Sequence, residues 1–148
     1  VAGTQALEMP SEFAKGYYIR PTVFADVRPD HQLFQEEVFG PVISITRFET
    51  DDQAIALANT GDFGLGVSIW SRDIARAHRL SRHIRGGIIW LNDHHRNDPR
   101  SVWGGVKDSG FGKENGWDAL RGYLSKKSVV IRTEPGYDDW FAGSNRYG

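Results

Sequence analysis

Two adjacent carboxylates stand just before an aromatic residue in this sequence, in a segment whose residue types and spacing can do chemistry. Residues 36–41 read EEVFGP, and a β-branched run follows directly. A carboxylate can accept hydrogen bonds from both hydroxyls of a sugar diol, and an aromatic side chain held beside it can pack against a planar ring. The acids can equally well cap or decorate a turn. Taken alone, the segment favours the structural interpretation.

A second cluster of polar side chains, Asp93, His94, His95 and Asp98, contains residue types that bind metals. Adjacent residues of an extended segment point to opposite sides, so His94 and His95 rarely share one ion, and zinc ligands usually have wider spacings. We therefore predict a polar loop that lines a cleft, and no metal site. A hydrolase or metal protein that uses these residues is a weaker alternative, because no G-x-S-x-G elbow accompanies them.

The remaining candidate motifs favour structural interpretations. Residues 110–116 read GFGKENG, which has neither the dinucleotide-binding spacing nor that of a P-loop, so we interpret these glycines as turn residues. The run of arginines between positions 72 and 85 is typical of a solvated helix face. The net charge of −1 excludes a strongly basic nucleic-acid binder, and the absence of cysteine excludes disulfides and a thiol nucleophile within this chain.

An alternation of strands and helices must position these groups. The chain has 148 residues, 39% of them hydrophobic, which fits one globular domain. Val42–Phe48, Leu65–Trp70 and Ile88–Leu91 are predicted strands. Two helices are predicted between them: Thr50 begins the first with a T-x-x-Q capping box, and Ser71 can cap the second. We therefore predict an α/β fold with an open, mainly parallel βαβαβ sheet and flanking helices.

Further elements are predicted on either side. Tyr17–Phe24 predicts an edge strand, because Pro21 cannot donate to a sheet. Gly116–Lys126 predicts a short helix and Ser128–Thr133 a last strand, and the aromatic-rich tail 135–148 is ordered only if it docks. The longest apolar run is far shorter than the roughly 20 residues that a membrane helix needs, and no signal sequence opens the chain. Since the first residue is Val, we expect a piece of a longer polypeptide, and because the absence of cysteine fits the cytosol, we expect a cytoplasmic protein.

Five motifs occur in order along the chain: GYYIRPTVF at 16–24, EEVFGPV at 36–42, FGLGVSIWS at 63–71, GGIIWLN at 86–92 and WGGVKDSGFGKENG at 103–116. Together they resemble the C-terminal part of the aldehyde dehydrogenase superfamily, whose members use NAD or NADP. The resemblance spans roughly residues 16–134. It implies a partial aldehyde dehydrogenase fold: residues 1–127 would belong to the C-terminal part of the catalytic domain, 128–134 to an oligomerisation strand and 135–148 to an aromatic-rich tail.

The resemblance also implies an activity. Members of the family oxidise an aldehyde to a carboxylic acid: a cysteine thiolate attacks the aldehyde, a hydride passes to the nicotinamide, and a water activated by a glutamate releases the acid. Carried over by motif, Glu37 would bind the hydroxyls of the nicotinamide ribose and Phe39 would pack against the nicotinamide. Trp103, Asp93 and His94 would line the substrate pocket. Four residues of the glycine-rich motif would be scaffolding: Lys107, Ser109, Gly110 and Glu114.

The chain departs from the family in ways that bear on function. It has no cysteine nucleophile, and neither the glutamate base nor the cofactor domain has a motif here, so we predict that the chain alone is inactive and binds NAD or NADP only weakly. The expected partners are a small-molecule aldehyde, the N-terminal cofactor-binding half of the same enzyme, and further copies joined through Ser128–Thr133; neither nucleic acid nor a membrane is expected. The alternative is a truncated, non-catalytic paralogue that acts as an oligomerisation or binding module.

The segment Asn92–Trp103, which would border the substrate entrance, carries more charge than greasy aldehydes require. One hypothesis is a polar or anionic aldehyde whose carboxylate pairs with Arg96 or Arg100. The other places these charges at the solvent rim, and the sequence favours it.

Overall fold

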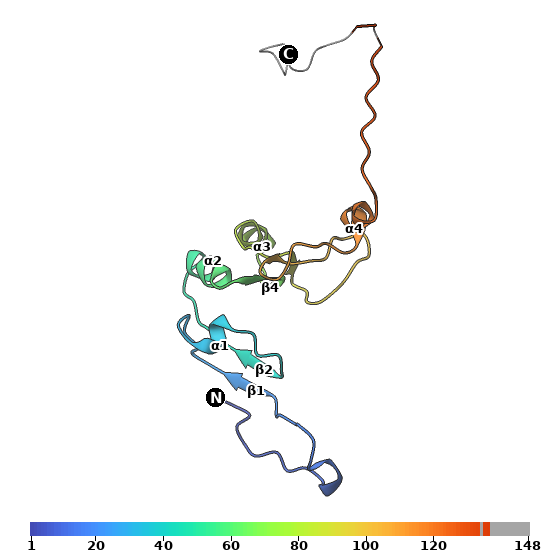
Figure 1. Ribbon diagram of the computed structural model, residues 1–148. Coiled ribbons are helices and arrows are strands. Elements are labelled where there is room, and N and C mark those ends of the chain that lie inside the picture. Colours follow the sequence, from blue (N-terminus) through green and yellow to red (C-terminus); the bar gives the residue numbers. More distant parts are fainter. Residues whose placement is uncertain (134, 137–148) are drawn as a thin grey trace.

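The computed structural model describes residues 1–133 and 135–136. Its helices and strands follow one another along an elongated body, and an extended segment leaves that body after the last helix (Figure 1). A short 3-10 helix, η1 (Ser11–Phe13), precedes the first strand. No helix in the described part of the chain is long and apolar enough to cross a membrane.

The first structural unit pairs two short parallel strands. β1 (Thr22–Phe24) lies beside β2 (Val42–Ser44), and α1 (Gln32–Gln35) connects them. The predicted strand over 17–24 forms only after Pro21, which has no N–H to donate, and the residues before it are largely exposed.

The second unit is a βαβ arrangement. β4 (Gly66–Ile69) and β5 (Ile88–Leu91) pair in parallel, and α3 (Ile74–Ser81) crosses between them. This part of the predicted βαβαβ sheet is confirmed. α2 (Asp51–Asn59) lies beside this unit, as Figure 1 shows.

The prediction that all three central strands share one sheet is wrong. In the described residues the strands form three separate pairs, and β2 bonds to β1 instead of β4. The β1–β2 pairing extends past the strand ends, because the amide of Ile45 donates to the carbonyl of Phe24 at 2.8 Å. The third pair is antiparallel and joins β3 (Phe63–Gly64) to β6 (Val106–Lys107), with the β4–α3–β5 unit between them in the chain.

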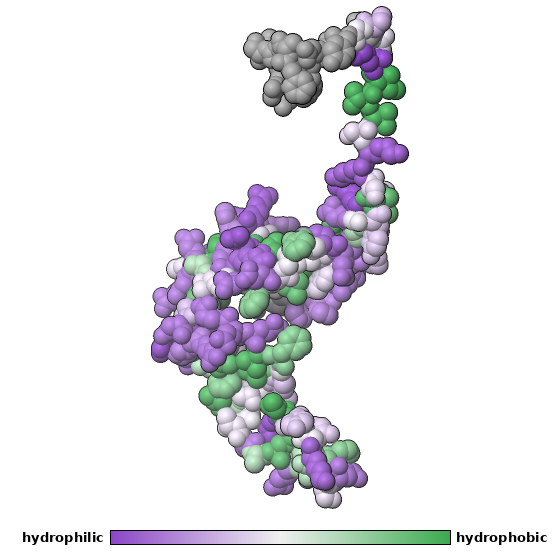
Figure 2. Space-filling view, in the orientation of Figure 1, coloured by the Kyte–Doolittle hydropathy of each residue, from purple (hydrophilic) through white to green (hydrophobic). Residues whose placement is uncertain are grey.

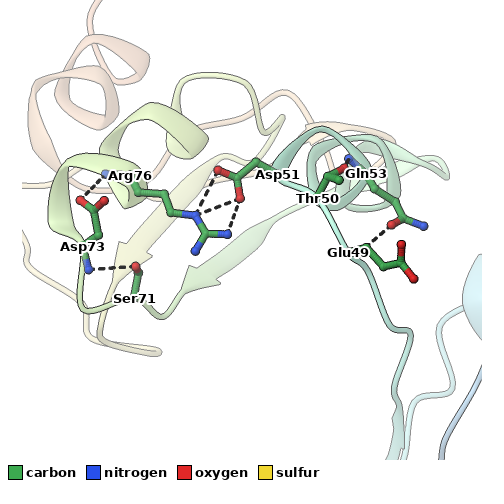
Figure 3. A network of polar contacts seen from close by, with 7 residues as sticks. All are labelled: Glu49, Thr50, Asp51, Gln53, Ser71, Asp73 and Arg76. Carbon is green, nitrogen blue, oxygen red and sulfur yellow. Dashed lines mark hydrogen bonds and ion pairs between the residues drawn. The ribbon is translucent and has the colours of Figure 1, made fainter.

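The helix caps follow the sequence closely but not completely. The amide of Gln53 donates to the Thr50 hydroxyl at 3.2 Å, which confirms one half of the predicted capping box, while the Gln53 side chain accepts the amide of Glu49 instead of that of Thr50. The second helix is capped by Asp73, whose carboxylate accepts the amide of Arg76 at 2.9 Å. Ser71, the predicted cap, instead accepts the amide of Asp73 at 3.1 Å, one step earlier in the turn. Figure 3 shows both caps and the Arg76–Asp51 ion pair that joins α3 to α2.

The core is small. Among the described residues, the buried hydrophobic side chains are Val27, Ile69, Ala77 and Trp90. Figure 2 shows hydrophobic side chains gathered on the surface over β1 and β2 and again along the extended segment. Large exposed apolar surfaces mark places where another polypeptide packs.

The C-terminal elements differ from the prediction. The short helix forms as α4 (Gly116–Gly122), a turn shorter than expected. Residues 128–133 form no strand with any described residue, because a strand needs a neighbour to bond and this segment lies away from the body (Figure 1). Val130 is 93% exposed. Of the predicted tail 135–148, all but 135–136 lies outside the described residues.

Candidate functional site

One of the two adjacent carboxylates is engaged and the other is not. Glu36 follows α1 directly, and its carboxylate accepts a hydrogen bond from Nε2 of Gln32, one helical turn earlier, at 2.8 Å. The carboxylate of Glu37 makes no hydrogen bond or ion pair with any residue that the structure describes. Glu37 is therefore the carboxylate of the pair that has both oxygens available to a ligand.

The turn after Glu37 presents an aromatic ring to solvent. The amide of Gly40 donates to the carbonyl of Val38 at 2.6 Å, and the amide of Val42 donates to the carbonyl of Gly40 at 2.8 Å. These bonds tighten the chain just before β2, and the Phe39 side chain, 96% exposed, projects from the turn. An open ring two residues from a free carboxylate fits a planar ring joined to a diol, as in a nicotinamide riboside.

A second group of side chains surrounds Trp90 at the C-terminal end of β5. The Trp90 ring lies 5.7 Å from the ring of His94, 6.3 Å from that of His95 and 5.9 Å from that of Trp103, measured between centroids. His95 and Trp103 meet edge to face at 6.3 Å. We call these four residues the ring cluster. Because Trp90 is buried and the histidines are exposed, the cluster links the core to the surface loop.

Hydrogen bonds fix the ring cluster to the βαβ unit. The Ser68 hydroxyl and Nδ1 of His94 are 2.8 Å apart, and Ser68 stands opposite Trp90 in the β4–β5 register. The indole N–H of Trp90 donates to the carbonyl of Arg96 at 2.8 Å. The Asp93 carboxylate accepts the amide of His94 at 2.8 Å. The loop that follows β5 is thus held against the strand ends by both its side chains and its backbone.

The two arginines of this loop, Arg96 and Arg100, differ in whether their guanidinium groups are paired. Arg100 binds Asp98 with two guanidinium bonds, at 3.2 and 3.1 Å, and donates its amide to the same carboxylate at 2.9 Å. The hydrogen bonds from Arg100, with the more distant charge of Arg96, hold the pKa of Asp98 below its usual value. The guanidinium of Arg96 has no hydrogen-bond or ion-pair partner among the described residues.

Both ends of the loop are anchored. At its start, the amide group of Asn92 accepts the Ser71 N–H at 2.8 Å and donates to the Ser71 carbonyl at 2.9 Å. At its end, Trp103 and Glu114 exchange backbone hydrogen bonds at 2.8 and 2.7 Å. Ser109 accepts the amide of Gly64 at 2.9 Å, so the glycine-rich motif is tied to β3 as well.

Comparison with known proteins decides the family. Residues 1–129 match the aldehyde dehydrogenase family. The chain belongs to the aldehyde dehydrogenase family. The match begins upstream of the first motif, so the shared region extends further toward the N-terminus than the motifs indicate.

Relatives in the aldehyde dehydrogenase family share the whole of this region. Peroxisomal aminoaldehyde dehydrogenase 1 of Pisum sativum is 41% identical over 132 residues, which are 89% of this chain and 26% of that protein. Betaine aldehyde dehydrogenase of Bacillus subtilis is 38% identical over 130 residues, 88% of this chain and 26% of that protein. The chain therefore spans about a quarter of the length of these aldehyde dehydrogenases.

A solved aldehyde dehydrogenase has the same fold. The crystal structure of betaine aldehyde dehydrogenase from Staphylococcus aureus in complex with NAD+ matches with a TM-score of 0.79 and 38% identity, over 85% of this chain and 25% of that chain. This likeness places the α/β elements of the chain in the aldehyde dehydrogenase fold.

The structure brings some of the residues predicted from the aldehyde dehydrogenase motifs together and leaves others apart. His94 and Trp103 meet around Trp90, and Asp93 lies beside them. Glu37 and Phe39 lie between α1 and β2, and no hydrogen bond or ring contact within the described residues joins them to the ring cluster. Among the described residues, no group of three His, Asp or Glu side chains could hold a metal ion.

Sequence reasoning missed Trp90 and Ser68 as members of the site. Both lie in motifs that characterise the family, and alternation along each strand could have placed them. Ser68 falls between Val67 and Ile69, so it faces the side opposite to the apolar residues of β4.

Proposed function

We propose that this chain is the C-terminal portion of an NAD(P)-dependent aldehyde dehydrogenase that oxidises an aldehyde to a carboxylic acid. The observation that carries the proposal is the family match over residues 1–129, within which Glu37 has a free carboxylate. The resemblance assigns that position to the cofactor.

In this proposal Glu37 and Phe39 bind the nicotinamide half of the cofactor. The Glu37 carboxylate accepts hydrogen bonds from the two ribose hydroxyls, and the exposed Phe39 ring packs against the nicotinamide. The cofactor, when bound, supplies the hydride acceptor. Glu36 is not its ligand, because Gln32 already holds its carboxylate.

The ring cluster borders the substrate entrance. Trp103, His94 and Asp93 are the residues that the resemblance places in the substrate pocket. The ring contacts of Trp103 and His94 with Trp90 give that wall a fixed shape, and Asp93 accepts the amide of His94. The chain contains no cysteine, so the nucleophile comes from the upstream part of the polypeptide, and the 148-residue chain alone is inactive. Residues 128–133 join a neighbouring subunit, since their apolar side chains are exposed and unpaired in the single chain.

The first experiment is the intact mass of the protein as its source makes it. A mass well above 16.6 kDa, with a cysteine-bearing upstream half, supports the dehydrogenase. A mass near 16.6 kDa favours the non-catalytic oligomerisation module.

The second experiment uses that protein to test the cofactor site. Glu37→Gln should raise the KM for NAD(P)+ by about tenfold, the cost of weakening a charge-assisted hydrogen bond to each hydroxyl. Glu36→Gln is the matched control and should change that KM less than twofold. Equal effects of the two variants would contradict the assignment.

A further inference from the structure

We propose that Arg96 recognises a carboxylate on the substrate, so that the enzyme prefers aldehydes that carry an anionic group at their far end. This inference rests on the proposed aldehyde dehydrogenase function and goes beyond it, since the family match does not select a substrate. Four observations on the loop after β5 support it.

The backbone of Arg96 is fixed at the ring cluster, while its guanidinium makes no hydrogen bond or ion pair within the described residues and acts on Asp98 only through its charge. The indole N–H of Trp90 holds the backbone carbonyl of Arg96 at 2.8 Å, so the residue cannot drift away from the substrate wall. No described residue pairs with its guanidinium. A guanidinium with open donors is suited to a carboxylate, because its parallel N–H groups match the two carboxylate oxygens.

Arg100 does not compete for this role. Both of its guanidinium bonds go to Asp98, which also accepts its backbone amide. The positive charge of Arg100 is thereby neutralised within the loop. Of the two arginines, Arg96 is the one with binding capacity to offer a ligand.

The same loop is poorly suited to a cationic aldehyde. Of its two acidic side chains, Asp98 is paired with Arg100, and Asp93 accepts the backbone amide of His94 with one oxygen. An ammonium group at the edge of the ring cluster would therefore be repelled by Arg96, and Asp93 is the acidic side chain of this loop that has no ion pair within the described residues.

The tryptophans do not form an open cage for a cation either. Cation–π binding needs a ring face within about 6 Å of the charge. Trp90 is surrounded by the rings of His94, His95 and Trp103 at 5.7, 6.3 and 5.9 Å, so its neighbours occupy the space that a cation would need. The rings of the cluster therefore pack against one another, and Arg96, the proposed anion-binding residue, is attached to them through its backbone carbonyl.

The test compares aldehydes of equal length in the complete polypeptide that carries this chain. The substrates are 4-oxobutanoate and butanal, 6-oxohexanoate and hexanal, and 4-aminobutanal as the cation. We expect Arg96→Gln to lower kcat/KM at least tenfold for an oxo acid and less than twofold for the matched alkanal. Arg100→Gln is the matched control and should lower both members of a pair less than threefold.

A direct binding measurement gives a readout that does not depend on turnover. Butanedioate and hexanedioate, the corresponding acid products, are titrated into wild type and the Arg96→Gln variant by calorimetry. Saturable binding that the variant loses, and that Arg100→Gln keeps, supports the proposal. The inference is overturned if Arg96→Gln changes oxo acid and alkanal equally and binds the dicarboxylates as wild type does. If wild type oxidises none of the five aldehydes, the proposed function itself fails. If wild type oxidises the alkanals and Arg96→Gln leaves kcat/KM for the oxo acids unchanged, the proposed function stands and only the role of Arg96 fails.

Discussion

The ammonium group of Lys107 donates hydrogen bonds to the carbonyl of Asn59 at 2.8 Å and to that of Gly61 at 3.0 Å, although it lies 48 and 46 residues away from them in the chain. These two carbonyls stand at the C-terminal end of α2, where the helix has no further amides to bond them. Lys107 belongs to β6, in the glycine-rich motif that follows Trp103. The glycine-rich motif is thus anchored to a helix end through one lysine.

Replacement of this lysine should weaken the whole unit. Lys107→Met keeps the side-chain length and removes both hydrogen bonds, so we expect the free energy of unfolding to fall by about 1–3 kcal/mol. Urea denaturation measures the change. Lys126→Met, at an exposed position, is the control and should stay within about 0.5 kcal/mol of wild type. Equal denaturation midpoints for the two variants would show that the Lys107 contacts carry no stability.

A close backbone approach makes Gly87 indispensable. A Cβ atom at this position would lie 1.7 Å from the carbonyl oxygen of Gly104, so Gly87→Ala must push the strand away from the glycine-rich motif. We expect a loss of about 3 kcal/mol and a displaced Trp103. Gly122→Ala meets no atom within 4 Å and should be neutral or slightly stabilising. Thermal unfolding of both variants, with tryptophan fluorescence as the readout, checks the contrast.

The pH dependence of stability has an identifiable contribution from Asp51. The Arg76 guanidinium, bonded to the Asp51 carboxylate at 2.9 and 3.0 Å, holds the pKa of Asp51 below its ordinary value (Figure 3). A lowered folded-state pKa stabilises the protein above the unfolded pKa of about 4, and the contribution disappears as the pH falls through the folded value. Asp51→Asn should therefore lower the unfolding midpoint by about 1–2 °C at pH 7, and the difference should close below pH ~4.

The neighbouring residue is the control for this pH effect. Asp52 stands in the same first turn of α2 and experiences the same helix dipole, but it has no ion pair among the described residues. Asp52→Asn should therefore leave the midpoint closer to wild type. If both variants show the same pH profile, the helix dipole and not Arg76 is the cause.

The Ser68–His94 contact should matter for substrate more than for stability. Ser68→Ala removes the hydroxyl that orients the His94 ring, and we expect KM for the aldehyde to rise about threefold to tenfold with the unfolding midpoint nearly unchanged. Steady-state kinetics with the complete polypeptide measures this. Ser44→Ala, on the exposed edge of β2, should alter neither quantity. A variant that unfolds earlier but keeps its KM would assign Ser68 a purely structural role.

Local signals in the sequence predicted the local structure well. The Thr50 cap is confirmed, and the reciprocal bond of the predicted capping box is shifted by one residue, because the Gln53 side chain accepts the amide of Glu49 at 2.8 Å. The β4–α3–β5 unit is confirmed. It could be predicted because the composition of each strand and the length of the helical crossover are properties of short, continuous segments of sequence. Asp73 replaces Ser71 as the cap because it stands two residues closer to α3, directly before its first residue, where its carboxylate reaches the amide of Arg76.

Long-range pairings could not be predicted in the same way. The partners of β2 and of β6 depend on which distant strand offers free hydrogen-bonding groups, and no local pattern encodes that choice. The position of Trp90 at the centre of the ring cluster depends on the register between β4 and β5. The motif that contains Trp90 does not specify this register. For 128–133, no described residue pairs with the segment, and a strand forms only where a neighbouring strand is present.

The two anchors of the loop between Asn92 and Trp103 have a consequence for how this protein can change. Asn92 is fastened to Ser71, and Trp103 to Glu114, by bonds that involve none of the residues between them. The two joints can therefore stay intact when the intervening residues change. The segment between them has further attachments, because His94 contacts Ser68 and the Arg96 carbonyl accepts the indole N–H of Trp90. A loop transplanted between homologues would keep its place only if it restored these inner contacts as well as the two joints.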